Sequence, residues 1–390
     1  MSKTKLSTRI VRSGIESDSQ HHAVIPPIYL SSNFAFEEFG KAGKYDYTRS
    51  GNPTRDLLGE ALAELEQGHG AIVTATGMAA VTLVLQLLDP SDLIFAPHDC
   101  YGGTYRLLSQ LKLRGIVNGE FHNQQDDAFI DTILDRKPRL VWIETPSNPL
   151  LRITDIARIA EAAHAVGAIV VVDNTFLSPA LQQPLLLGAD IVIHSTTKYI
   201  NGHSDVVGGA VVAKTAELYE RLKYWANCLG LTASPFDSYL TLRGLRTLKA
   251  RLNLHLANTA AVVEVLNNHA AVRKTYYPGL ASHSGHALAA RQQSGFGAML
   301  SFELQDTEAV KVFLANLELF SLAESLGGVE SLVAHPASMT HAAMDPEARR
   351  VAGISDGLLR LSVGIEDGED LCHAVQTALD AVLALQQEAA

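Results

Sequence analysis

Cysteine is scarce in this sequence. Its 390 residues include three cysteines, Cys100, Cys228 and Cys372, which lie far apart and are odd in number. They offer neither a disulfide framework nor the spacing of a zinc site. His335 and His341 also lack the spacing of metal ligands. We therefore expect no disulfide and no bound metal.

Long hydrophobic runs and an excess of positive charge are missing as well. No apolar run reaches the ~18 residues of a membrane span, and no hydrophobic region follows the basic start Met1–Lys5, so we expect no secretory signal. The formal net charge of −11, without a basic cluster, argues against a nucleic-acid partner. Because 47% of the residues are hydrophobic, the chain has enough apolar side chains for a substantial core. We expect a soluble, cytoplasmic protein with no membrane partner.

The apolar runs divide the chain into three parts. Residues 1–50 are polar and rich in turn residues, which predicts an extended arm. Across residues 51–247, apolar runs of strand length alternate with helical patterns, and the runs lack the period-two alternation of a half-exposed sheet. This part predicts a doubly wound α/β domain with a mostly parallel sheet, covered on both faces, and a functional site at the carboxyl ends of its strands.

The last part, residues 248–390, changes character. A long helical pattern begins near Ser238 and runs past Leu266. Residues 298–304 and 359–363 alternate between apolar and polar types, as half-buried strands do. We therefore expect a smaller C-terminal α+β domain.

Two successive apolar strands each end in a residue suited to cofactor chemistry. Residues 168–172 are followed by Asp173, and residues 189–193 are followed by His194-Ser195-Thr196-Thr197-Lys198. Pyridoxal phosphate needs an amine for its Schiff base and a carboxylate that keeps its ring nitrogen protonated. Each motif alone is common turn or loop chemistry. Their occurrence at the ends of consecutive strands predicts a pyridoxal phosphate site.

A glycine-containing segment offers a place for the phosphate of that cofactor. Thr76-Gly77-Met78 follows an apolar strand and opens a helical pattern. Backbone amides at a helix N-terminus favour an anion, and the hydroxyls of Ser195 and Thr197 can complete a phosphate cup. A tight turn between strand and helix is the plain alternative for Gly77.

Two further strand ends carry candidate cofactor contacts. Tyr101 follows the strand that ends near Pro97, and its ring can stack on a pyridine. Asn148, in the segment Glu144–Pro149, can donate to a ring hydroxyl. Both segments also have the composition of ordinary turns.

Four segments together resemble the pyridoxal-phosphate enzymes of cysteine and methionine metabolism, and the match covers nearly the whole chain. The segments are Tyr45–Thr54, Asp173–Phe176, His194–His203 and Glu324–Leu332. The resemblance implies a fold type I, aspartate aminotransferase-like α/β fold with a mostly parallel central sheet. It also implies that pyridoxal 5'-phosphate is the cofactor.

The resemblance assigns roles around the cofactor. Lys198 is implied to be the Schiff-base lysine and proton carrier, Asp173 the partner of the ring nitrogen and Tyr101 the stacking aromatic. Tyr47 and Arg49 are implied to reach the phosphate of the neighbouring subunit, so the arm would contact that subunit in a dimer with shared sites. The family is usually tetrameric, and we expect a homotetramer. The residues implied to hold the phosphate or the ring are Gly77, Met78, Asn148, Ser195 and Thr197.

The resemblance also assigns residues that contact the substrate. Arg360 matches the arginine that binds the substrate α-carboxylate, with Ser325 and Asn148 beside it. Relatives that act at Cγ carry an acidic residue at the position of Glu324. The residues that could bind a distal carboxylate, such as that of a succinyl group, are Arg106 and Arg49.

The expected activity is a γ-replacement that belongs to methionine biosynthesis. Cysteine would replace the succinyl group of O-succinylhomoserine, giving cystathionine and succinate. One alternative is γ-cleavage of cystathionine, because Glu324 and Arg106 would serve it equally. The acyl donor also stays open between succinyl, acetyl and phospho groups. A non-catalytic regulator with this fold is a further alternative, but no catalytic residue is missing.

Overall fold

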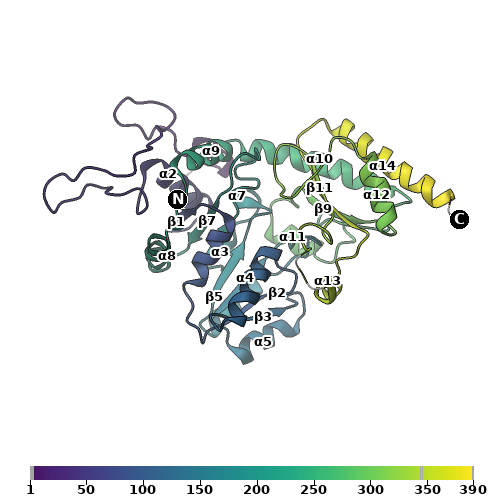
Figure 1. The fold of residues 1–390 in the computed structure, drawn as a ribbon, viewed down its shortest axis with the longest axis horizontal. Coiled ribbons are helices and arrows are strands. Elements are labelled where there is room, and N and C mark those ends of the chain that lie inside the picture. The colour runs from purple at the N-terminus through teal and green to yellow at the C-terminus, as the bar shows by residue number, and fades with distance from the viewer. Residues whose placement is uncertain (1–3, 343, 345, 389–390) are drawn as a thin grey trace.

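The computed structural model describes residues 4–342, 344 and 346–388 and arranges them around two β-sheets. Figure 1 shows the first sheet in the lower middle of the view and the second sheet at the right. The long helix α10 (Leu248–Asn268) runs along the top toward the second sheet. The expected α/β fold with a smaller C-terminal α+β part is confirmed. The boundaries at residues 50 and 247 stay predictions.

The first sheet has the strand order β1-β7-β6-β5-β4-β2-β3. Strand β7 runs antiparallel to both of its neighbours, and the other pairs are parallel. The apolar runs predict every strand except β3, which lies at the sheet edge, is only partly buried and needs few apolar side chains. The strands are β1 (Gly70–Thr74), β2 (Leu93–Pro97), β3 (Asn118–His122), β4 (Leu140–Glu144), β5 (Ile169–Asp173), β6 (Ile191–His194) and β7 (Gly209–Ala213).

Helices cover both faces of this sheet, which explains why its strands lack polar alternation. On β4, Val141 and Ile143 join a core that includes helices α2, α5 and α6, whereas Leu140 and Trp142 join a core that includes α3, α4 and α8. The helices on the first face are α2 (Pro53–Glu66), α5 (Ala128–Arg136) and α6 (Ile156–Ala165), and those on the second are α3 (Gly77–Leu85), α4 (Gly102–Leu113) and α8 (Ala216–Leu229). Short helical elements and α9 complete this part: α7 (Ser178–Leu181), η1 (Pro184–Leu187) and α9 (Pro235–Leu245).

The second sheet has the strand order β10-β11-β12-β9-β8. Apolar side chains on one of its faces, such as Leu300 and Leu361, share a core with α10, α12 and α14. The strands are β8 (Lys274–Tyr276), β9 (Met299–Glu303), β10 (Ser321–Leu322), β11 (Leu332–Ala334) and β12 (Leu358–Ser362). The remaining helices are α11 (His286–Gln292), α12 (Thr307–Asn316), α13 (Pro346–Ala352) and α14 (Gly368–Glu388).

The polar face of the second sheet is buried, so the expectation of half-buried strands is wrong. Ser301, Arg360 and Ser362 alternate with apolar residues on β9 and β12, yet all three are buried. The Ser301 hydroxyl donates to the Pro149 carbonyl at 2.7 Å, and Ser362 Oγ accepts from the Gly327 amide at 2.8 Å. The alternation is real, but these polar side chains bind loops instead of solvent.

The expected continuous helix from Ser238 past Leu266 is interrupted, because α9 ends at Leu245 and α10 begins at Leu248. The guanidinium of Arg251, buried in α10, donates at 2.8 Å to the carbonyl of Gly244 near the break. An arginine from the next helix therefore satisfies a carbonyl beside the interruption.

The N-terminal arm is not extended throughout. It begins with helix α1 (Leu6–Arg12), whose Ile10 is fully buried in the core of the first part. Residues 13–52, all of which the structure describes, contain no helix or strand, and they loop out from the body at the left of Figure 1. No helix in the part of the chain that the structure describes is long and apolar enough to cross a membrane.

Candidate active site

The main cavity, of about 570 Å³, receives side chains from the strand ends of the first sheet and from the C-terminal part of the chain. It brings together nearly all of the predicted site residues. Those that line it are Gly77, Met78, Tyr101, Arg106, Asn148, Asp173, Ser195, Thr197, Lys198, Glu324, Ser325 and Arg360. Of the predicted residues, Tyr47 and Arg49 do not line this cavity.

Lys198 follows β6 and projects an amine into this cavity. Its Nζ donates to the hydroxyl of Ser325 at 2.7 Å, and the side chain is largely buried. Burial lowers the pKa of Lys198 to about 8, and the positive charge of Arg360 acts in the same direction, whereas Glu324 opposes it. Much more of this amine than of an ordinary lysine is therefore neutral near neutral pH, and the neutral form can act as a nucleophile or base.

Asp173 is the last residue of β5. One oxygen accepts from the Thr175 amide at 3.0 Å, and the carboxylate forms no ion pair with any described residue. Burial raises the pKa of Asp173 above its ordinary value. The carboxylate thus lacks a counter-ion, and a protonated ring nitrogen would supply one.

The start of α3 meets the end of β6 closely enough to form a cradle. Thr76 caps the helix by accepting from the Ala79 amide at 2.9 Å. A Cβ on Gly77 would lie 2.9 Å from Cβ of Ser195, so the close approach requires glycine. The amides of the first helical turn lack intrahelical acceptors. Together with the Ser195 and Thr197 side chains in the same cavity, they suit a phosphate.

Tyr101 stands immediately before α4. Its amide donates to Glu144 at 2.7 Å, while 45% of the residue remains exposed. A Cβ on Gly103 would lie 2.5 Å from Tyr101 Cε1, so this glycine leaves room for the ring. Arg106, on the same helix, lines the cavity and forms no ion pair with the described residues.

Arg360 on β12 is a buried cation at the cavity wall. Its Nη1 donates to Asn148 Oδ1 at 2.9 Å and its Nη2 to the Ser325 carbonyl at 2.8 Å. Its Nε is buried and has no partner among the described residues. Burial lowers the pKa of Arg360 to about 10, while the charge of Glu324 opposes that shift. A guanidinium with neutral partners and a spare donor suits a carboxylate ligand.

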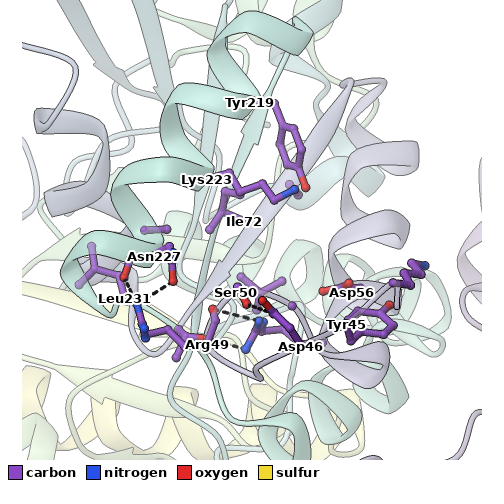
Figure 2. A pocket seen from close by; sticks show the side chains of 17 residues that line it. Tyr45, Asp46, Arg49, Ser50, Asp56, Ile72, Tyr219, Lys223, Asn227 and Leu231 are labelled. Atoms are coloured by element: carbon purple, nitrogen blue, oxygen red, sulfur yellow. Dashed lines mark hydrogen bonds between the residues drawn. The ribbon is translucent and has the colours of Figure 1, made fainter. Parts of the chain in front are cut away.

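Tyr47 and Arg49 lie outside the cavity that contains Lys198. Arg49 lines a separate cavity of about 410 Å³, where Figure 2 shows it beside Asn227 of α8. Its Nη1 donates at 2.8 Å to both the carbonyl and the side-chain oxygen of Asn227. Tyr47 is 48% exposed, and the Arg49 guanidinium lies 5.5 Å from the centre of its ring. Their expected contact with a neighbouring subunit's phosphate stays a prediction.

The cavity also contains residues that the sequence reasoning missed. Glu144 is the last residue of β4, as Asp173 is of β5, and Thr175 lies two residues beyond Asp173, so this signal could have identified both. Met339 and Thr340 follow β11 in a segment without periodicity, which offers no comparable signal. The missed lining residues include Glu144, Pro146, Thr175, Phe176, Val207, Met339 and Thr340.

The chain is similar to known proteins over almost its full length. A sequence model of the family described as Cys/Met metabolism PLP-dependent enzyme matches residues 7–380. The chain is 57% identical over 369 residues to a cystathionine gamma-synthase of Escherichia coli (strain K12), which covers 94% of this chain and 96% of that protein. It is 45% identical to a cystathionine beta-lyase of Coxiella burnetii, covering 97% of this chain and 98% of the relative. A crystal structure of cystathionine gamma synthase from Xanthomonas oryzae pv. oryzae in complex with cystathionine superposes with a TM-score of 0.97 at 61% identity, covering 98% and 100% of the two chains.

Proposed function

The chain belongs to the pyridoxal-phosphate-dependent enzymes of cysteine and methionine metabolism, and within this family we propose that it is a transferase acting at Cγ. Cysteine sulfur replaces the succinyl group of O-succinylhomoserine, and the products are cystathionine and succinate. Similarity to gamma-synthases of two bacteria over nearly whole chains supports this choice. The reaction supplies cystathionine for methionine biosynthesis.

The residues around the main cavity fit the family's cofactor. Lys198 would carry it, Asp173 would pair with its ring nitrogen, and Tyr101 would stack on its ring. When bound, pyridoxal phosphate supplies an electron sink that lets protons leave the α- and β-carbons and lets a group leave Cγ. The residues that would hold its phosphate and ring hydroxyl are Gly77, Met78, Ser195, Thr197 and Asn148.

Lys198 is the proposed proton carrier. With a pKa lowered to about 8, its Nζ can exist in either protonation state near neutral pH. It can therefore take a proton from one substrate carbon and return it to another. The Ser325 hydroxyl, 2.7 Å from Nζ, orients the amine.

Two arginines would determine substrate specificity by binding the two carboxylates of the substrate. Arg360 would bind the α-carboxylate through its unpaired Nε and its other donors, beside Asn148 and Ser325. Arg106, exposed at the same cavity, would bind the distal carboxylate of the succinyl group. Glu324 also lines the cavity and would face the γ-position of the substrate. The proposal rests on one observation. Arg360 and Arg106, neither of which pairs with a carboxylate of the described residues, line the same cavity as Lys198, whose amine has a lowered pKa.

We infer that the active enzyme is a homo-oligomer, either a dimer or a tetramer, in which pairs of subunits share their active sites. Tyr47 and Arg49 would reach the phosphate in the neighbouring subunit, because they lie apart from the main cavity of their own chain. The arm also exposes large apolar side chains that a second copy would cover, including Leu30, Phe36 and Phe39. A cytoplasmic location stays a prediction from the sequence.

Parallel kinetics test the proposed reaction. One assay supplies O-succinylhomoserine with cysteine, and the other supplies cystathionine alone. We expect cystathionine and succinate in the first assay to form much faster than the second substrate is cleaved. When cysteine is omitted, succinate should still be released, together with 2-oxobutyrate and ammonia. Rapid cleavage of cystathionine with negligible synthesis would instead identify the runner-up, a cystathionine γ-lyase, which would use Glu324 and Arg106 in the same way.

A further inference from the structure

Glu144 is a buried carboxylate that the proposed reaction leaves without a role. It ends β4 directly beside Asp173, its register partner on β5, and it lines the main cavity while only 6% of the residue is exposed. It forms no ion pair with the described residues. Burial raises the pKa of Glu144, and the neighbouring charge of Asp173 raises it further. An acid kept in so unfavourable a place calls for a function.

Each oxygen of Glu144 has its own donor. Oε2 accepts from the backbone amide of Tyr101 at 2.7 Å, and Oε1 accepts from the indole Nε1 of Trp142 at 3.1 Å. Both donors are nitrogens, and a carboxylate can satisfy both because each of its oxygens is an acceptor. Each donor thus occupies one oxygen, and the bond to Tyr101 is independent of the bond to the indole.

The bond to Tyr101 acts where α4 begins. Tyr101 is the N-cap residue of this helix, and its own side chain makes no capping hydrogen bond. In a capping box, a glutamate from the helix itself accepts from the N-cap amide. Glu144 performs this task from a strand 43 residues away in the sequence, and the field of the helix N-terminus favours its negative charge.

The backbone of Tyr101 determines where its ring lies. The ring passes over Gly103, where any Cβ would clash with it, and nearly half of Tyr101 is exposed, so packing alone holds the ring weakly. We propose that Glu144 is a positioning residue that fixes the main chain of Tyr101, so that the stacking ring and Asp173 are held in register by adjacent strand ends. The inference rests on the proposed function only in assigning Tyr101 and Asp173 to the cofactor.

Three variants separate the hydrogen bond from the charge. Glu144→Gln leaves one acceptor oxygen for two donors, so either Tyr101 or Trp142 loses its partner. Trp142→Phe removes the indole donor and is the matched control. In the double variant, the amide oxygen is free to accept from Tyr101 again, while the side chain beside Asp173 still cannot ionise.

The main readout is the visible circular dichroism of the purified holoenzyme without substrate, which reports how the bound cofactor is oriented. We expect Glu144→Gln to lose about half of the signal per bound cofactor and about tenfold in kcat, because small misplacements of a positioning group carry large kinetic costs. Trp142→Phe should keep the signal, and the double variant should recover most of it. An unchanged signal in Glu144→Gln, or a double variant as impaired as Glu144→Gln, overturns the proposal.

Glu144→Asp covers the case in which Glu144→Gln does not fold. It keeps an ionisable carboxyl group near Asp173 but withdraws the oxygens from Tyr101, so the signal should fall as it does in Glu144→Gln. A full signal in Glu144→Asp overturns the proposal. Because the signal is recorded without substrate, it does not depend on which reaction the wild type catalyses. A wild type that fails to make cystathionine would refute the proposed function alone.

Discussion

The amine of Lys198 donates a hydrogen bond of 2.7 Å to the hydroxyl of Ser325, across 127 positions of sequence. Ser325 provides that hydroxyl from a left-handed backbone conformation, with φ at 82°. Such a conformation is costly for a residue other than glycine. The contact therefore places a residue of the C-terminal part against the lysine at the expense of local stability.

Two substitutions of Ser325 should separate the cost of its backbone conformation in stability from the contribution of its hydroxyl to activity. Ser325→Ala and Ser325→Gly both remove the contact with Lys198, but only glycine relieves the backbone. We expect the glycine variant to be more stable than the alanine variant by about 1 kcal/mol, and both to have a lower kcat/KM than the wild type. Thermal unfolding of the apoenzymes measures the difference, and equal Tm values would contradict the strain.

The lowered pKa of Lys198 predicts how the apoenzyme takes up its cofactor. Only the neutral amine of Lys198 attacks the aldehyde group of pyridoxal phosphate. The rate at which the cofactor becomes attached should therefore rise with pH and level off above about 8. Arg360→Gln removes a positive charge and should raise the pKa, moving the inflection to higher pH. Glu324→Gln should move it to lower pH. Stopped-flow absorbance across this pH range measures both shifts, and an inflection near that of an ordinary lysine would refute the assignment.

Asp173→Asn should keep the fold and lower the rate. The amide oxygen can still accept from the Thr175 amide, as Asp173 Oδ1 does at 3.0 Å. A neutral amide cannot hold a ring nitrogen protonated, so we expect kcat to fall about a hundredfold or more. Far-UV circular dichroism and cofactor content control for folding. A rise in KM with kcat unchanged would be inconsistent with this role.

Subunit mixing tests the placement of Arg49 across a boundary. Lys198→Ala protein should lack the visible cofactor band and nearly all turnover, and Arg49→Ala protein should be poorly active. After exchange, a mixed dimer has one site with both native residues, so activity should recover to about a quarter of the wild type. Exchange is verified by native mass spectrometry. If activity does not recover although the subunits have exchanged, Arg49 acts within its own subunit and not at the neighbouring site.

Arg106→Ala should discriminate between acyl donors. Loss of the guanidinium should raise KM for O-succinylhomoserine about tenfold, and change KM for O-acetylhomoserine little, because only the first has a distal carboxylate. Arg114→Ala is the matched control, since Arg114 ends the same helix and does not line the cavity. Equal effects on both donors would exclude the succinyl contact.

That the residues assigned to the cofactor line one cavity could be predicted, because they stand at or just after strand ends. Asp173, Lys198 and Gly77 occur where apolar runs stop, and parallel strands bring their carboxyl ends to one edge. Glu144 also ends a strand, but its partner is a main-chain amide, which no sequence pattern identifies. Arg49 does not line the main cavity of its own chain, so only the family resemblance gave it a place near a phosphate.

Features that depend on tertiary packing were harder to predict. The alternation in β9 and β12 has the same form whether the polar face meets water or another part of the protein. Only the packed structure distinguishes these cases, through contacts such as that of Ser301 with Pro149. Likewise, the interruption near Gly244 coincides with a carbonyl bound by Arg251, and local helical propensity carries no trace of that contact.

The buried polar row of the second sheet also restricts how this protein can evolve or be engineered. Ser301 and Arg360 are register partners, and Ser362 holds the Gly327 amide two residues beyond Ser325. Replacing either serine by valine would be a conservative change for an ordinary core and would increase apolar burial. Here it would release the loops that carry Asn148 and Ser325, so a design method that rewards stability alone would select variants with better packing and poorer chemistry.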